Sequence, residues 1–475
     1  MKYQTVIGLE VHLQLKTKTK AFCGCAIDFG KTPNSSCCPV CLGFPGSLPV
    51  YNKQALNSAI KVALALDCQI QEHTKFDRKN YFYPDLPKNY QISQFDLPLS
   101  KNGFLNIVAG QNLKRIGITR VHLEEDAGKL IHETEASLID FNRTGIPLLE
   151  IVSEPEISSP QEAFDYLTSL KSIIEYLDVS DCDMEKGSLR CDANISLRPE
   201  GVQELGVKTE LKNMNSFKGV KDALTFEITR QTELLVNQIP MSQETRLWDA
   251  EKGITVAMRS KEGAKDYRYF PDPDLTVFII GQDQIDKIKQ LLPELPQDKL
   301  KRFRVDYGLN EYDARILVNS KKDSEFAEDC LKQYPEKDKK NMVNWLIGPL
   351  MSEAHTRKID LHATGIDISD LINLIGFVNR QEISHLSAKS VLTQILDTQK
   401  SAQQLIKENN LRQISDSGEL EQIILTVIQE NAKSVNDFKE GKINALMYLV
   451  GQVMKKSSGK ANPKTVQELI RRRLI

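Results

Sequence analysis

The residues with the clearest chemical potential are acidic and histidine side chains that alternate with apolar ones in short segments of the first half of the chain. In a strand, residues two positions apart lie on the same face. In Gly8–Leu15, Glu10 and His12 therefore lie on one face, while leucine and valine fill the other. Acidic residues recur in the other alternating segments. The whole set comprises Glu10, His12, Glu124, Glu125, Glu150, Asp192 and Glu210.

This set has two interpretations: the solvated face of an antiparallel sheet or a site for a divalent cation. Carboxylates gathered on one surface repel one another unless a cation or basic groups neutralise them. Mg²⁺ takes oxygen ligands and leaves positions open for substrate phosphates. Glu10, His12, Glu125 and Glu150 would suit such a site, with His12 either as a ligand or as a group that orients one. Alternation does not show which strands are neighbours. The magnesium site therefore also requires that the strands with these residues lie side by side.

Five of the nine cysteines fall within nineteen residues, and four of them form two closely spaced pairs. Twelve residues separate the pair Cys23 and Cys25 from the pair Cys38 and Cys41, with Cys37 as a spare. This spacing is typical of a structural Zn²⁺ knuckle over about residues 22–42. Four thiolates would complete the zinc tetrahedron, so the role would be structural. Four reduced cysteines without a metal, or an iron–sulfur cluster, are the alternatives.

Two basic segments could contact phosphates. A loop over residues 76–88 combines tyrosines and phenylalanines with bases that include Lys79 and Lys88, which suits a nucleotide or an RNA end. The alternative is a surface loop that packs on its own tyrosines. Residues 455–475 carry a net charge of +6, which favours phosphate binding over a solvated helix end. The bases are Lys455, Lys456, Lys460, Lys464, Arg471, Arg472 and Arg473, against one acid, Glu468.

The elements that must position these residues change along the chain. Turn residues and alternating segments predict a mainly antiparallel sheet in an α+β domain over residues 1–292, with helices over 52–66 and 160–177. Helical periodicity then predicts an all-helical region over 293–408 and a small helical tail domain over 409–475. The expected strands are 5–15, 116–123, 148–152, 189–197 and 207–211.

Composition restricts the class of protein. A chain of 475 residues with 40% hydrophobic and 27% charged residues is ordinary for a globular protein, and its net charge of −2 confines any nucleic-acid contact to local surfaces. No apolar run reaches the ~18 residues of a membrane span, and the first residues do not read as a signal peptide. We therefore expect a cytoplasmic protein. No P-loop or dinucleotide glycine motif occurs, so any ATP site is of another kind.

Motifs along nearly the whole chain resemble the GatB family, the B subunit of the bacterial tRNA-dependent amidotransferase, with a YqeY-like tail. The matching segments are GLEVHLQL at 8–15, FCGCAIDFG at 22–30, CPVCLGFPGSLPVYN at 38–52, FDRKNYFYPDLPKNYQISQ at 76–94, ITRVHLEEDAGK at 118–129, DFNRTGIPLLEIVSEPEI at 140–157, EKGSLRCDANISLRPEG at 185–201, KTELKNMNSFKGV at 208–220, MRSKEGAKDYRYFPDPDL at 258–275 and SSGKANPKTVQELI at 457–470.

The resemblance implies a ligase that forms a carbon–nitrogen bond with glutamine as amido donor. Members of the family convert Glu-tRNA(Gln) to Gln-tRNA(Gln), and often Asp-tRNA(Asn) to Asn-tRNA(Asn), in a heterotrimer whose other members are an amidase and a small third protein. The GatB member uses ATP and Mg²⁺ to phosphorylate the side-chain carboxylate on the tRNA, and ammonia from the amidase displaces the phosphate. The alternative is a non-catalytic tRNA-binding scaffold in such a complex.

The resemblance also implies roles for residues. Glu10, His12, Glu125 and Glu150 would hold Mg²⁺, and Glu124 would be a further catalytic-site residue that contacts an ion or ATP. Lys79 and Lys88 would steady the phosphoryl group or line the exit of ammonia. Cys23, Cys25, Cys38 and Cys41 match the members that bind Zn²⁺, and the basic residues of the tail would bind tRNA. The implied ATP contacts are Arg190, Asp192, Asn194, Lys208 and Glu210.

Overall fold

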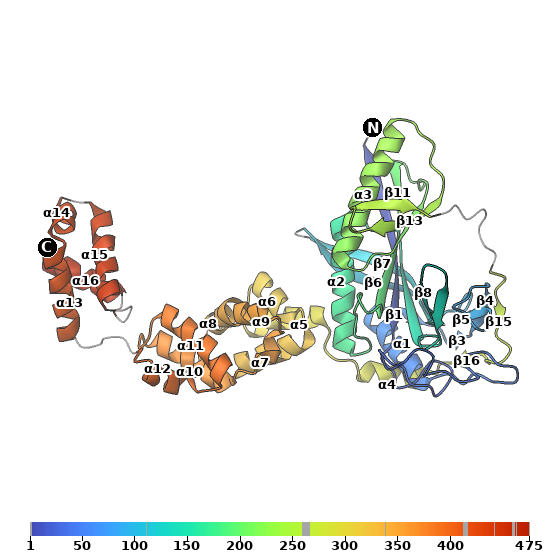
Figure 1. The fold of residues 1–475 in the computed structure, drawn as a ribbon, viewed down its shortest axis with the longest axis horizontal. Helices are drawn as coiled ribbons and strands as arrows, with labels where there is room; N and C mark the ends of the chain where they lie inside the picture. Colours follow the sequence, from blue (N-terminus) through green and yellow to red (C-terminus); the bar gives the residue numbers. More distant parts are fainter. Residues whose placement is uncertain are drawn as a thin grey trace. The chain divides into compact units, whose positions relative to one another are not determined.

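A computed structural model describes residues 2–110, 112–258, 267–337, 339–411, 417–440, 442–457, 461 and 463–474. Contacts within the chain divide it into two compact units, Met1–Pro296 and Gln297–Ile475 (Figure 1). Among the described residues, no helix is long and apolar enough to cross a membrane.

A nine-stranded sheet forms the centre of the first unit, with β1 (Tyr3–Gln14) as its middle strand. Both neighbours of β1, β10 (Pro147–Ser153) and β11 (Leu189–Pro199), run antiparallel to it. Every other pairing in this sheet is antiparallel except β12–β13. The remaining strands are β7 (Asn112–Glu125), β6 (Ser100–Ala109) and β2 (Gln69–Ile70) beyond β10, and β12 (Thr209–Lys212), β13 (Glu244–Asp249) and β14 (Ile254–Ala257) beyond β11.

The apolar positions of β1 turn toward a helical layer. Leu9, Val11 and Leu13 are about 1% exposed and belong to one core with residues of four helices. Burial of alternate residues on one face leaves the other face free for the polar positions. The helices that contribute to this core are α1 (Lys53–Ala65), α2 (Pro160–Leu177), α3 (Phe217–Val236) and, through Ile288, α4 (Gln282–Gln290).

Small sheets hold the loops around the central one. β4 (Asp77–Asn80) pairs with β5 (Tyr90–Ser93) and with β15 (Phe270–Pro271), and β5 contacts β7 of the large sheet. The basic loop predicted over residues 76–88 therefore begins on a strand that is fixed to the rest of the unit. The other short elements are β3 (His73–Thr74) with β16 (Phe278–Ile279), β8 (Lys129–His132) with β9 (Ser137–Asp140), and α4 (Gln282–Gln290).

The second unit is helical in its described residues and contains two separate apolar cores. One core extends from Phe303 to Ile406 and includes a π-helical turn over Leu346–Leu350 and a 3₁₀ turn over Leu361–Thr364. Its α-helices are α5 (Pro296–Asp306), α6 (Glu311–Val318), α7 (Lys321–Gln333), α8 (Lys340–Trp345), α9 (Met351–Arg357), α10 (Ile368–Asn379), α11 (His385–Thr398) and α12 (Ala402–Glu408). The other core belongs to α13 (Ser417–Glu430), α14 (Ala432–Lys439), α15 (Ile443–Lys456) and α16 (Pro463–Leu474).

These observations confirm the predicted fold class, an α+β region with a mainly antiparallel sheet followed by helices to the end of the chain. The domain limits at residues 292 and 408 remain predictions. The two cores of the second unit are compatible with a separate small tail domain, because each buries its own apolar residues.

Candidate active site on the polar face of the sheet

The register of the central strands brings the polar positions of separate segments together. His12 on β1 lies opposite Glu150 on β10 and opposite Arg190 on β11. Glu150 in turn lies opposite His122 on β7. Directly opposed residues of an antiparallel pair point to the same face. One polar surface therefore crosses four neighbouring strands.

Three side chains on this surface, including Glu124 two residues after His122, could hold a metal ion. His12, Glu124 and Glu150 each offer one ligand atom, and the three atoms lie within 4.8 Å of one another. The His12 Nε2–Glu150 Oε2 distance is 3.4 Å, and the two glutamates are buried. Two carboxylate oxygens and one nitrogen would occupy only part of the octahedral shell of Mg²⁺, so positions for phosphate oxygens would remain. The donor set therefore fits the implied ion.

This group contains two of the four predicted magnesium ligands and one residue that was not among them. His12 and Glu150 come together as predicted, but Glu124 completes the group, and neither Glu10 nor Glu125 belongs to it among the described residues. Glu125, one residue further along β7, points to the opposite face. There its carboxylate lies 2.5 and 2.6 Å from Lys88 Nζ and accepts a hydrogen bond from the backbone amide of Ile92.

His122 is a part of this site that the sequence patterns did not assign. Its Nε2 lies 3.0 Å from Glu124 Oε1 and 3.3 Å from Glu150 Oε2, and the side chain is 3% exposed. Burial alone would lower the pKa of His122, but the charges of Glu150 and Glu124 outweigh burial and raise it to about 9. The same imidazole lowers the pKa of Glu150 in spite of the burial of that carboxyl. Alternation with Glu124 along β7 was the signal that could have identified His122.

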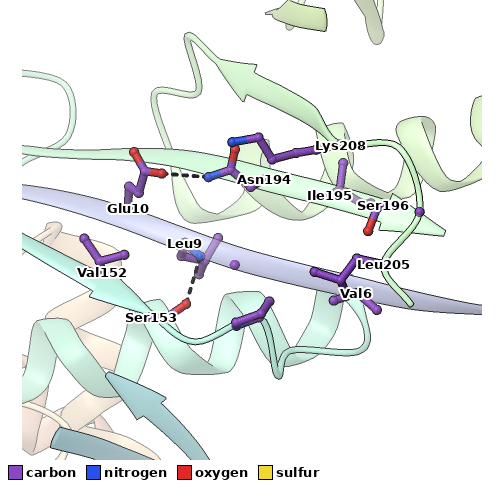
Figure 2. A pocket seen from close by; sticks show the side chains of 13 residues that line it. Val6, Leu9, Glu10, Val152, Ser153, Asn194, Ile195, Ser196, Leu205 and Lys208 are labelled. Atoms are coloured by element: carbon purple, nitrogen blue, oxygen red, sulfur yellow. Dashed lines mark hydrogen bonds between the residues drawn. The ribbon is translucent and has the colours of Figure 1, made fainter. Parts of the chain in front are cut away.

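A cavity of about 240 Å³ opens next to Glu10 on the same face. Asn194 Nδ2 donates a hydrogen bond to Glu10 Oε1 at 2.8 Å, while the buried Oδ1 of Asn194 has no partner among the described residues. Figure 2 shows Lys208 extending toward Asn194 across this cavity. An unsatisfied buried acceptor beside an exposed lysine suits a ligand that offers both hydrogen-bond donors and negative charge.

The other predicted ATP contacts are engaged in ion pairs. Arg190 donates to Asp126 Oδ1 at 3.0 Å. Asp192 and Glu210 both pair with Lys212, and the pairing lowers the pKa of Glu210 despite burial. Of the predicted ATP-binding residues, Asn194 and Lys208 line the cavity, whereas Arg190, Asp192 and Glu210 do not.

The four predicted cysteines also converge. The sulfur atoms of Cys23, Cys25, Cys38 and Cys41 lie within 4.8 Å of one another, and Cys37 is outside the group. Tetrahedral Zn–S bonds of ~2.3 Å would put the sulfurs ~3.8 Å apart, so the donor set fits zinc. The backbone amide of Cys38 donates to Cys41 Sγ at 3.2 Å. A hydrogen bond from Cys23 is the largest cause that lowers the pKa of Cys41, to about 4.

The two predicted lysines of the aromatic loop have different surroundings. Lys88, paired with Glu125, lines a cavity of about 270 Å³ that also contacts Cys23 and Cys41. Lys79 Nζ lies 5.0 Å from the centre of the Tyr267 ring, a cation–π distance. Lys88 is thus the lysine that the structure connects with both the acidic sheet and the cysteine group.

The described bases of the tail lie on the surface of its helices. Lys455 and Lys456 end α15, and Arg471, Arg472 and Arg473 are in the last turn of α16. Two of the five pair with acids, Lys456 with Glu430 at 2.6 Å and Arg473 with Glu421 at 3.3 Å. The prediction for Lys460 lies outside the described residues, as does the side chain of Lys464.

Comparisons with known proteins give one consistent result. Residues 5–286 match the family model described as the GatB/GatE catalytic domain, and residues 325–474 match the one described as the GatB domain. A protein of Caldanaerobacter subterraneus subsp. tengcongensis is 52% identical over 475 residues, covering 100% of both chains. One from Brevibacillus brevis is 49% identical over 99% of this chain and 98% of its own length. Both are named as the B subunit of an aspartyl/glutamyl-tRNA(Asn/Gln) amidotransferase.

Proposed function

Because the chain belongs to the GatB/GatE family, we propose that it is the B subunit of an aspartyl/glutamyl-tRNA(Asn/Gln) amidotransferase and carries out the ATP-dependent step. The observation that carries the proposal is the His12, Glu124 and Glu150 group beside a cavity on the polar face of the sheet. Its substrates would be ATP and Glu-tRNA(Gln) or Asp-tRNA(Asn), and its partners in a heterotrimer would be an amidase and a small third protein. Relatives of full length that bear this name support the substrate class.

The chemistry needs an activated carboxylate. A carboxylate is a poor acyl donor, so one of its oxygens attacks the γ-phosphorus of ATP and ADP leaves. Ammonia then attacks the carbonyl carbon of this acyl phosphate and expels phosphate, which gives the amide. The nitrogen would come from glutamine, hydrolysed by the amidase partner.

The residues of the polar face would hold the reacting groups. His12, Glu124 and Glu150 would hold the Mg²⁺, which would neutralise charge on the phosphate oxygens during transfer. His122 fixes both glutamates through its hydrogen bonds. Glu10 and Asn194 would bind donor groups of the nucleotide in the cavity, and the exposed Lys208 would face its phosphates. Arg190, Asp192 and Glu210 would complete the charged surface around ATP.

Two further parts of the unit would support this reaction. The cysteine group would hold a structural Zn²⁺, because four thiolates leave no position for water or substrate. Lys88 and Glu125, in a cavity outside the ATP site, would line the route of ammonia, with Lys79 on the same loop. Ammonia is small and neutral, so it could pass through this cavity of about 270 Å³.

The proposal is tested by reconstitution of the complex with its amidase and its small third protein. We expect glutamine- and ATP-dependent conversion of Glu-tRNA(Gln) or Asp-tRNA(Asn), with ATP hydrolysis stimulated by the mischarged tRNA. Each tRNA is assayed separately, because the choice between them defines the substrate. A complex that binds the tRNA but never hydrolyses ATP would instead support the non-catalytic scaffold.

The tail is proposed to bind the tRNA backbone through its exposed bases. Ending the chain at Leu411 keeps the residues of the first helical core, since the tail helices have a core of their own. We expect KM for tRNA to rise about tenfold or more, because phosphate contacts dominate nucleic-acid affinity. KM for ATP should stay the same. Steady-state kinetics of the assembled complex measure both values, and an equal change in the two would contradict the assignment.

A further inference from the structure

A glycine turn of the cysteine segment lies directly against Lys88. Gly43, two residues after Cys41, has a φ of +69°, and its amide donates to the Val40 carbonyl at 3.1 Å. A Cβ at Gly43 would lie 2.4 Å from Lys88 Cγ and 3.3 Å from Lys88 Cα. No side chain fits between this turn and the stem of Lys88 without displacing one of them.

The far end of Lys88 is equally constrained. Its side chain is 7% exposed, and Nζ contacts both carboxylate oxygens of Glu125. A buried amine in this position depends on its partner, because an unpaired buried charge is strongly unfavourable. The place of the stem, set by Gly43, therefore decides whether the amine reaches Glu125.

A second path of contacts connects the cysteine group with the same glutamate. Lys20, which is 0% exposed, has its Nζ 3.6 Å from Cys41 Sγ. Gly145 lies between Cys41 and Glu125, because a Cβ at this position would be 3.7 Å from Cys41 Cβ and 3.7 Å from Glu125 Oε2. The segment around Cys41 thus meets the Lys88–Glu125 pair at two glycines, Gly43 beside Lys88 and Gly145 beside Glu125.

We infer that the metal site of the four cysteines positions Lys88 on Glu125, and that Gly43 is the positioning residue that transmits this constraint. A metal bound to Cys38 and Cys41 fixes the turn between Cys41 and Gly43, and the turn holds the stem of Lys88. The zinc site, which is structural in the proposed function, thereby sets the geometry of an ion pair outside its own shell. This inference rests on the proposed metal but not on the proposed reaction.

Two glycine substitutions isolate the contact from backbone strain. Gly43→Ala introduces a Cβ at a positive φ and against Lys88. Gly30→Ala, the control, introduces a Cβ at a similar φ of +80°, in the same cysteine segment, with nothing within 4 Å. Strain at a positive φ is shared by both variants, so a difference between them reports the collision with Lys88.

The experiment measures acetylation rates of individual lysines by mass spectrometry on the full, zinc-loaded chain. Lys88 should react on the order of tenfold faster in Gly43→Ala, because overpacking weakens its ion pair with Glu125. In Gly30→Ala, Lys88 should react at the wild-type rate. Lys20 should stay protected and the zinc content unchanged in Gly43→Ala, which excludes melting of the segment. Removing zinc from the wild-type chain with a chelator should also raise the acetylation rate of Lys88. This second test needs no substitution.

Several outcomes would overturn the inference. These are an unchanged Lys88 rate in Gly43→Ala, an equal increase in Gly30→Ala, or full protection of Lys88 after zinc removal. The acetylation and zinc measurements use no ATP, tRNA or partner proteins, so a failure of the proposed function would leave them unaffected. In the assembled enzyme, Gly43→Ala should lower kcat for glutamine-dependent amidation without changing KM for ATP, because Gly43 does not line the ATP cavity. A purely structural defect would lower the fraction of active enzyme and the zinc content together.

Discussion

Replacement of Glu150 by glutamine is expected to lower ATP-dependent amidation by about 10³-fold, since a metal ligand supplies several kcal/mol of charge stabilisation in the transition state. Glu150 lies between His12 and His122 and belongs, with Glu124, to the group proposed to hold the metal. An amide in its place keeps the shape but removes the charge. Single-turnover amidation at saturating tRNA, together with a Mg²⁺ titration, measures the effect.

The matched variants separate the observed group from the predicted one. Glu124→Gln should behave like Glu150→Gln, whereas Glu125→Gln should leave the Mg²⁺ dependence unchanged, because Glu125 faces Lys88. Glu200→Gln, an exposed acid just after β11, serves as the control. If Glu125→Gln weakened Mg²⁺ binding as much as Glu124→Gln, the ligand set predicted from the sequence would be favoured instead.

Replacement of Cys41 by serine is expected to reduce bound zinc from about one ion per chain to nearly none. It should also lower the unfolding temperature of the first unit by roughly 5–10 °C, for a loss of ~3 kcal/mol. Cys41 is the buried member of the group, and it accepts the amide of Cys38. Metal analysis of the purified chain and a thermal melt of the same sample check the two effects.

Cys37→Ser is the control for this prediction. Cys37 is adjacent to Cys38, a proposed zinc ligand, but lies outside the group of four sulfurs. The Cys37→Ser variant should bind zinc and unfold at the same temperature as the wild-type chain. A wild-type chain purified without zinc, or a Cys37→Ser variant that loses it, would contradict the assignment.

Local patterns in the sequence were sufficient for the fold class and for the polar face. Alternation separates Glu10 and His12 from Leu9 and Val11, and β1 has this pattern of burial. The physical reason is that a strand has a period of two residues whatever its neighbours are. The four cysteines were equally accessible to sequence reasoning, because their spacing is confined to one short segment.

Helix α3 is an element that the sequence patterns did not predict. Its buried residues include Glu227 and Gln231, so its buried side lacks the apolar period by which a helix is predicted. Glu227 is 0% exposed and pairs with Arg230, and it accepts a hydrogen bond from Thr255 of β14. A buried charge is tolerated only with such partners, and one of the two, Thr255, is supplied by a strand that follows later in the chain.

By itself, the sequence determined which residue types alternate, where turns divide the segments and which cysteines are close neighbours. The tertiary structure alone decided that Glu124 and His122 join His12 and Glu150, while Glu125 turns to Lys88. The physical reason is strand register: a shift of one residue exchanges the two faces of a strand. Register and strand order arise from burial of the apolar face as a whole, which no single segment encodes.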